Sequence, residues 1–167
     1  MSGRLALAVV AAGLAGGWAP AAGARDSLGT FESWAAFRDP GVPRCYAIAA
    51  PARSGLAGRW RPFAAISYWP RAGVRGQVHV RLSREIATNA RIIATIGESR
   101  FVLVGGGADA WPADRRADAA IVAAIRSGTS LSISTRARTG ASFTDTYRLR
   151  GAATAIDAAA LGCGRLR

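Results

Sequence analysis

The chain has 167 residues, a formal net charge of +12 at pH 7 and no lysine, so that arginine carries all of its basic charge. This length suits one domain with a full hydrophobic core. The charge favours anionic partners such as lipid headgroups, lipopolysaccharide phosphates or acidic glycans, and peripheral contact with a membrane is compatible with it. Aromatic residues interleaved with base-reading polar groups are missing, so we expect no nucleic acid partner.

The first 24 residues have the three parts of a secretory signal peptide. Arg4 precedes an apolar run over residues 5–15, and the small residues Ala22 and Ala24 form a cleavage site before Arg25. The run is too short for a membrane span of about 20 residues, although a retained N-terminal anchor is the alternative. We therefore expect residues 25–167 to form a single domain in the periplasm of a Gram-negative envelope or outside the cell.

The two cysteines, Cys45 and Cys163, are the only ones in the chain. An even number of cysteines in an exported chain indicates a disulfide, because the compartment is oxidising. We expect the two to be paired, which would fasten the C-terminal segment to the first hairpin. Two free buried thiols are the alternative.

Short apolar runs alternate with turn residues along the rest of the chain, which predicts an antiparallel β-rich fold. Strands are predicted over residues 28–37, 45–49, 63–69, 77–83, 91–96, 101–104, 131–134 and 146–150. The most regular alternation lies in residues 77–83, where Val78, Val80 and Leu82 should face the core while His79 and Ser83 face out.

Two helices are predicted between these strands. The first begins around Trp111-Pro112 and ends before Gly128, and the second covers residues 152–161, with Ile156 and Leu161 on its apolar side. About eight strands with two helices are typical of an antiparallel β-sandwich with helical additions. The triple glycine 105–107 lacks the lysine of a phosphate-binding loop and is interpreted as a bend between sheets.

Several motifs together resemble the invasion-associated locus B family of exported bacterial proteins. They are a tryptophan upstream of R-C-Y-A-I (44–48), the segment I-R-S-G-T-S-L (125–131), the segment T-D-T-Y-R-L-R-G (144–151), and an alanine-rich helix that ends in a cysteine. The resemblance covers nearly all of residues 25–167. It implies an immunoglobulin-like β-sandwich in the bacterial envelope, a link to host-cell invasion in some members, and no known enzyme activity or cofactor.

Six positions of this chain match recurrent positions of that family. They are Trp34, Cys45, Gly128, Tyr147, Gly151 and Cys163. All six have ready structural roles, so none is a candidate catalytic residue. The loop over residues 51–61 has no motif that the resemblance accounts for.

Four arginines near the C-terminus form the best candidate binding site. Arg136 and Arg138 share one outward parity and Arg148 and Arg150 another, and a hairpin around Gly140 would place both pairs on one sheet face. A solvated charged face is the alternative to a docking surface for an anionic envelope component or an acidic partner protein. We expect Asp145 or Asp157 to offset part of this charge.

No residue set forms a catalytic or metal-binding signature. His79 is the only histidine and lies on the outward side of its strand, so a serine–histidine pair or a metal site lacks its usual components. Trp34, Trp60, Trp69 and Trp111 could form a sugar-stacking platform, but such residues more often fill a core.

We therefore expect a non-catalytic envelope or secreted interaction protein. The alternatives are an inhibitor of an envelope-directed hydrolase such as lysozyme, and a hydrolase with an unrecognised site that has Trp60 or His79 at its edge.

Overall fold

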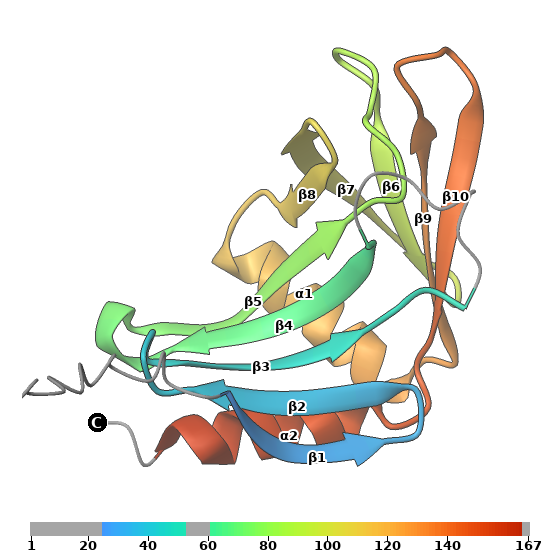
Figure 1. Ribbon diagram of the computed structural model, residues 1–167. Coiled ribbons are helices and arrows are strands. Elements are labelled where there is room, and N and C mark those ends of the chain that lie inside the picture. The colour runs from blue at the N-terminus through green and yellow to red at the C-terminus, as the bar shows by residue number, and fades with distance from the viewer. Residues whose placement is uncertain (1–24, 53–60, 165–167) are drawn as a thin grey trace, which may run out of the picture.

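The computed structural model describes residues 25–52 and 61–164, which form ten strands and two α-helices (Figure 1). Every strand pair is antiparallel, and the strands form one sheet in the order β1-β2-β3-β4-β5-β8-β7-β6-β9-β10. The predicted signal peptide and Trp60 lie outside the described residues. The prediction of a mainly β fold with two helices is confirmed.

The first half of the sheet is a meander of five strands. They are β1 (Asp26–Phe31), β2 (Trp34–Asp39), β3 (Arg44–Ala49), β4 (Phe63–Trp69) and β5 (Val74–Arg81), and the short 3-10 helix η1 (Pro70–Ala72) lies between β4 and β5. The single strand predicted over residues 28–37 is wrong, because the chain reverses at Glu32 and Ser33 to pair β1 with β2. Glu32 adopts a φ of 55° there, a turn conformation that a glutamate does not signal.

The second half of the sheet contains the other five strands. They are β8 (Asp109–Pro112), β7 (Ser99–Gly106), β6 (Ile92–Ile96), β9 (Ser130–Arg136) and β10 (Ser142–Arg148). Strand β8 was not predicted, and the first helix was expected to begin in its place. The triple glycine is therefore not a bend between sheets, since Gly105 and Gly106 pair with Ala110 and Asp109 of β8. A Cβ atom on Gly105 would lie 2.3 Å from the carbonyl oxygen of Asp109, so the close strand pairing requires glycine.

The two halves join through a narrow neck. Within the described chain β5 pairs with β8 only at Val80 and Arg81. Two residues before Val80, the amide of Val78 donates a hydrogen bond to a carboxylate oxygen of Asp118 at 2.8 Å and not to a neighbouring strand. Burial of Asp118 raises its pKa more than this hydrogen bond lowers it.

The far ends of the sheet approach each other. The Ser33 amide, just before β2, donates to the carbonyl of Arg150, just after β10, at 3.3 Å. The Ala52 amide, which follows β3, donates to the carbonyl of Thr146 in β10 at 2.7 Å. The sheet is thus strongly curled, and its concave side encloses most of the core.

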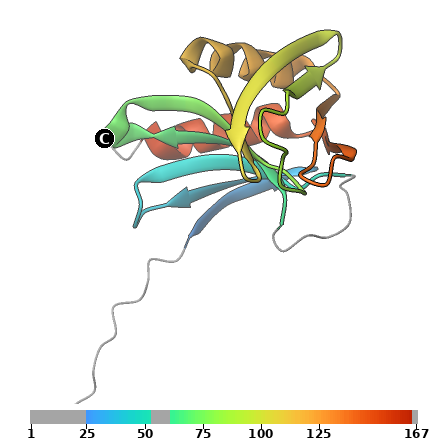
Figure 2. The ribbon, with the colours of Figure 1, turned by 90° about the horizontal axis from the view of Figure 1, so that it is seen from above.

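The helices α1 (Arg115–Ser127) and α2 (Ala152–Gly164) pack on this concave side. Helix α2 covers β1 to β4 and helix α1 covers β5, β7 and β8, so that the sheet curls around both (Figures 1 and 2). The strands belong to one continuous sheet, so the predicted immunoglobulin-like β-sandwich is not confirmed. Alternation of apolar and polar residues along a strand shows that one face of the sheet is buried, but it does not show what covers that face. Here the two helices cover much of it.

The helix boundaries follow local capping. Asp114 caps α1, because its side chain accepts a hydrogen bond from the amide of Ala117 at 2.8 Å. Gly128 ends α1, and a Cβ atom there would lie 2.6 Å from Ile96. The predicted burial of Leu161 in α2 is wrong, since this side chain is 75% exposed.

The disulfide between Cys45 and Cys163 is present as predicted. It joins β3 to the end of α2 across a sequence separation of 118 residues, with a Cα–Cα distance of 5.6 Å. Both cysteines are buried. The C-terminal helix is therefore covalently fastened to the middle of the first half of the sheet.

Candidate functional site

The side of the second half-sheet that faces away from the helices is open to solvent, and we call it the outer face. It consists of the outward side chains of β6, β7, β9 and β10, which line up in rows across the strands. One row contains Val102, Ile93, Ser134 and Thr144. The next contains Arg100, Thr95, Ser132 and Thr146.

The β9–β10 hairpin places the four predicted arginines on this outer face or at its ends. Arg136 pairs with Ser142 at the turn end of the hairpin, and Arg148 pairs with Ser130 at the other end. All four predicted arginines are exposed. Six residues of strand separate the two ends, which is about 20 Å. The four arginines therefore form two pairs and not one cluster.

Two of the four arginines already have acidic partners. Arg138 forms an ion pair with Glu85 at 2.6 Å, and Arg150 forms one with Glu32 at 3.3 Å. The predicted offset by Asp145 or Asp157 is wrong. Asp157 pairs with Arg126 on the helical side of the molecule.

Asp145 lies fully buried on the inner side of β10. One of its carboxylate oxygens accepts a hydrogen bond from the amide of Ser83 at 2.7 Å. Ser83 was predicted to face out and is buried instead, because this hydrogen bond draws the end of its segment against β10. The prediction assumed that the alternation of β5 continues past Leu82, whereas β5 ends at Arg81.

Two further arginines join the outer face and were not singled out from the sequence. Arg91 precedes β6. Arg100 belongs to β7 and lies opposite Thr95 of β6. Both are exposed, and within the described residues neither they nor Arg136 and Arg148 have a carboxylate partner. The outer face thus carries four guanidinium groups that no described acid neutralises.

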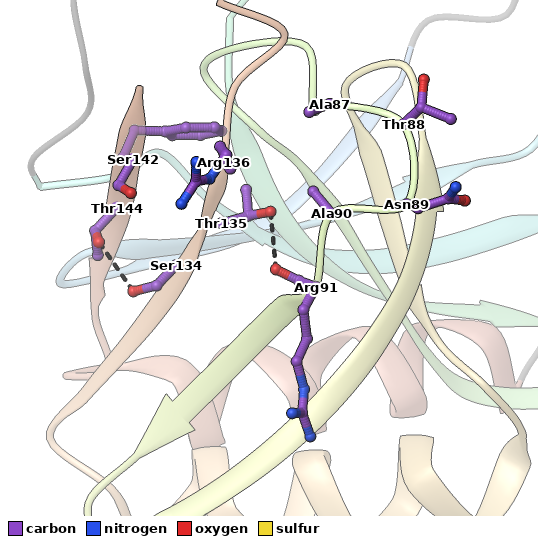
Figure 3. A pocket seen from close by; sticks show the side chains of 11 residues that line it. Ala87, Thr88, Asn89, Ala90, Arg91, Ser134, Thr135, Arg136, Ser142 and Thr144 are labelled. Atoms are coloured by element: carbon purple, nitrogen blue, oxygen red, sulfur yellow. Dashed lines mark hydrogen bonds between the residues drawn. The ribbon is translucent and has the colours of Figure 1, made fainter. Parts of the chain in front are cut away.

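A pocket of about 530 Å³ opens at the turn end of the outer face (Figure 3). One wall is the loop over residues 87–91, and the other is the turn end of the β9–β10 hairpin. It is lined by Ala87, Thr88, Asn89, Ala90, Arg91, Ser134, Thr135, Arg136, Ser142, Phe143 and Thr144. The lining therefore contains two arginines, five hydroxyl groups, an amide and no carboxylate.

The side of the outer face nearest β5 is apolar and aromatic. Val102 and Val104 are each about half exposed, and Val104 pairs with the partly exposed Trp111 of β8. His79 stacks on Trp111 with ring centroids 5.0 Å apart. The predicted tryptophan platform is thus reduced here to one exposed ring.

Other tryptophans of the predicted platform have different positions. Trp34 is buried in the core, and Trp69 lies under the guanidinium of Arg44 at 5.1 Å. The described chain therefore gives no row of exposed tryptophans on which a sugar polymer could stack.

His79 is held by Asp109 and is more than a solvated surface residue. Asp109 accepts a hydrogen bond from Arg81 at 2.8 Å and lies 2.8 Å from the His79 ring nitrogen Nε2. Burial alone would raise the pKa of Asp109. The hydrogen bonds with Arg81 and His79 together lower this pKa by more than burial raises it, so the pKa falls below the usual value. These contacts tie β5 to β8 at the neck of the sheet.

The positions implied by the family resemblance have structural contacts. The Trp34 indole donates to the carbonyl of Arg148 at 2.9 Å and so joins β2 to the end of β10. Tyr147 is fully buried, and burial raises the pKa of its phenol. Gly151 has a φ of +85°, and a Cβ atom there would lie 1.9 Å from the carbonyl oxygen of Phe31.

No three His, Cys, Asp or Glu side chains lie close enough to hold a metal ion in the ranges 25–52 and 61–164. In the same ranges, neither helix is long and apolar enough to span a membrane.

The chain shares its fold with a protein of known structure. It is similar to invasion associated protein B from Bartonella henselae, with a TM-score of 0.56, 15% sequence identity, and coverage of 84% of this chain and 99% of that one. No protein-family model matches the chain, and no curated protein does. The resemblance noted in the sequence is thus confirmed at the level of the fold, in an arrangement that spans almost the whole of the known structure.

Proposed function

We propose that this chain is an exported, non-catalytic binding protein of the bacterial envelope, which docks on an anionic envelope component through its outer face. The disulfide and the shared fold are consistent with export to the periplasm or beyond. The observation that carries the proposal is the set of four exposed guanidinium groups without a described acidic partner on one sheet face.

The chemistry of these groups favours binding over catalysis. A guanidinium stays protonated at any physiological pH, so it neither donates nor accepts a proton during a reaction near neutrality. It does offer several N–H donors in a planar fork that matches phosphate and carboxylate oxygens. Between the arginines, Ser132 and Ser134 face Thr146 and Thr144 across the hairpin and provide further hydrogen-bonding groups.

The overall charge supports the same conclusion. Arg4 is the only charged residue before Arg25, so nearly all of the net charge of +12 remains after cleavage of the predicted signal peptide. A field of this size attracts an anionic surface from a distance, and salt screens it. The arginines of the outer face would then decide which side of the protein touches that surface.

Binding to vesicles tests this proposal. The oxidised protein, expressed from the full chain with its own leader, is mixed with neutral vesicles and with vesicles that contain anionic lipid or lipopolysaccharide. An arginine near an anionic membrane contributes about 1 kcal/mol. The double variant Arg136→Gln/Arg148→Gln should therefore bind anionic vesicles about thirtyfold more weakly, and raised salt should weaken binding of the unaltered protein.

A matched control separates position from net charge. Arg115 and Arg116 are exposed at the start of α1, on the helical side of the sheet. The variant Arg115→Gln/Arg116→Gln removes the same charge and should lose much less affinity than the outer-face variant. Equal losses in both variants would show that net charge alone drives binding, and unchanged binding in both would refute the proposal.

A further inference from the structure

We propose that the pocket between the 87–91 loop and the β9–β10 hairpin binds a single anionic sugar residue, one that carries a phosphate or a carboxylate. The inference rests on the proposed function, in which the outer face docks on an anionic envelope component. It adds one binding site on that face and one class of ligand. It is carried by the composition of the pocket, its support from the backbone and the positions of its arginines.

The pocket walls are held in place by backbone contacts. The Ala87 amide donates to the carbonyl of Arg136 at 2.9 Å, and the hydroxyl of Thr135 donates to the carbonyl of Arg91 at 3.0 Å. These two bonds fix both ends of the loop to β9. A site whose walls are already ordered loses little conformational freedom when a ligand binds.

The tip of the same loop is also ordered. The Ala90 amide donates to the carbonyl of Ala87 at 3.0 Å. Asn89 adopts a φ of 60°, a conformation that asparagine tolerates better than most residues. Thr88 and Asn89 belong to the pocket lining, and Figure 3 shows their side chains projecting from the turn on the side away from β9 and β10.

The two arginines of the pocket lie on opposite walls, Arg91 at the end of the loop and Arg136 at the end of β9. The pairing of β6 with β9 ends at Ile93 and Ser134, and the carbonyl of Arg136 accepts a hydrogen bond from the amide of Ala87 at the other end of the loop. Both side chains carry a positive charge at the same pocket. An anion bound in the pocket would be attracted by both charges, and no carboxylate lines the pocket to oppose the anion.

The side chains leave room for such a ligand. Figure 3 shows the Arg136 guanidinium beside Ser142, whereas the Arg91 side chain extends the opposite way, from the loop along the sheet. Within the described residues no side-chain hydrogen bond or ion pair holds the Arg91 guanidinium. An exposed arginine changes rotamer on a picosecond to nanosecond timescale, so Arg91 can turn toward a ligand without any movement of the backbone.

The remaining lining selects a sugar over other anions. The hydroxyls of Ser134 and Thr144 lie 2.9 Å apart on the pocket wall, and Thr88, Asn89 and Ser142 add further polar groups. Hydroxyl and amide groups both donate and accept hydrogen bonds, which matches the hydroxyls of a sugar ring. The pocket volume of about 530 Å³ lies within the usual range for small-molecule sites of about 300–1,000 Å³.

The apolar part of the lining argues against an acyl chain as the occupant. It consists of two alanines and Phe143, and Phe143 is itself only 8% exposed. An acyl chain needs a continuous apolar wall. On the outer face the exposed apolar side chains are Val102 and Val104, which do not line the pocket. The anionic headgroup of a glycolipid, rather than its tail, is therefore the part that fits.

The test is a titration of the oxidised, isotope-labelled protein followed by amide chemical shifts. The probes are glucose 6-phosphate, glucuronate, neutral glucose and inorganic phosphate. Glucose 6-phosphate, glucuronate or both should shift the amides of Asn89, Ser134 and Thr144 in a saturable way. Neutral glucose and inorganic phosphate should each bind at least tenfold more weakly. The two anionic arms also show whether phosphate or carboxylate is preferred, which separates a phosphorylated glycolipid from a uronic acid polymer as the source of the ligand.

Two variants locate the site. Arg136→Gln should weaken the preferred anionic sugar about tenfold or more, because it removes a charged hydrogen-bond donor from the pocket. Arg138→Gln, two residues away but paired with Glu85 and outside the lining, should leave the affinity within twofold. If both variants bind equally well, or if inorganic phosphate binds as tightly as the sugars, the inference is overturned.

This outcome is separate from the fate of the proposed function. Vesicle binding that depends on Arg136 and Arg148, with no saturable shift by either anionic sugar, would overturn the sugar site and leave the docking surface standing. A saturable sugar shift without vesicle binding would support the pocket and refute docking on lipid surfaces.

Discussion

Removal of the Cys45–Cys163 disulfide should cost this protein a large part of its stability. The bridge closes a loop of 118 residues, and the loop-entropy relation gives about 5 kcal/mol of stabilisation for a loop of that length. Non-covalent packing holds α2 only weakly by comparison, since most of its buried residues other than Cys163 are alanines, which have little apolar area to bury. Domains of this kind have total stabilities of about 5–15 kcal/mol.

Urea unfolding of the variant Cys45→Ala/Cys163→Ala, compared with the oxidised protein, measures this loss. Alanine is the better replacement because serine would leave a hydroxyl in a buried position. We expect a strong decrease in the unfolding midpoint and a larger m-value, because the unfolded chain expands once the loop is open. The reduced wild-type protein should behave like the variant. A loss below about 1 kcal/mol with an unchanged m-value would refute the loop-entropy reasoning.

Two further predictions concern single residues. Gly151→Ala should destabilise the protein by more than about 2 kcal/mol in the same urea assay. The alanine would have a left-handed backbone conformation and its Cβ atom would clash with the carbonyl of Phe31. A loss below about 0.5 kcal/mol, which is the usual range for surface substitutions, would contradict this geometry. Burial raises the pKa of Asp109 in the folded state, but Arg81 and His79 lower it by more. The ionised carboxylate therefore stabilises the fold at pH values above the ordinary aspartate pKa of about 3.9, and this stabilisation is lost as the pH falls through the folded-state pKa. The melting temperature of wild type should therefore fall more steeply below about pH 4 than that of Asp109→Asn, and parallel curves would exclude Asp109 from the acid response.

Local features of this fold were predictable from the sequence. The alternation in residues 77–81 and the hairpin around Gly140 depend on neighbouring residues, and both are present in the structure. Gly140 has a φ of +86°, which explains why glycine marks that turn. The outward positions of Arg136 and Arg148 follow from the same period of two.

Features that depend on distant contacts or on ambiguous turns were not predictable. The turn at Glu32 lacks glycine and proline, so the break between β1 and β2 left no mark in the pattern. Strand β8 has four residues and ends in a proline, which is too short for a periodicity to show. Alternation also cannot tell whether helices or a second sheet cover the buried face, so the single curled sheet was beyond it.

The pocket was missed for the same physical reason. Its two arginines come from segments 45 residues apart in the sequence, and only the contacts of the 87–91 loop with β9 bring them to one pocket. Strand order in a ten-stranded sheet is decided by packing across the whole domain. A parity argument could have placed Arg91 on an outward face, but it could not have chosen β9 as the adjacent strand.

The bond between Val78 and Asp118 covers part of a sheet edge in the middle of the molecule. Beyond its two residues of contact with β8, strand β5 would otherwise offer unpaired amides along an edge in the middle of the molecule, and such an edge can add a strand from another copy. The helix carboxylate occupies one of those amides at 2.8 Å and places a negative charge and the body of α1 where an incoming strand would have to lie. Helix α1 thus occupies the place at the narrowest part of the sheet where a further strand could otherwise pair.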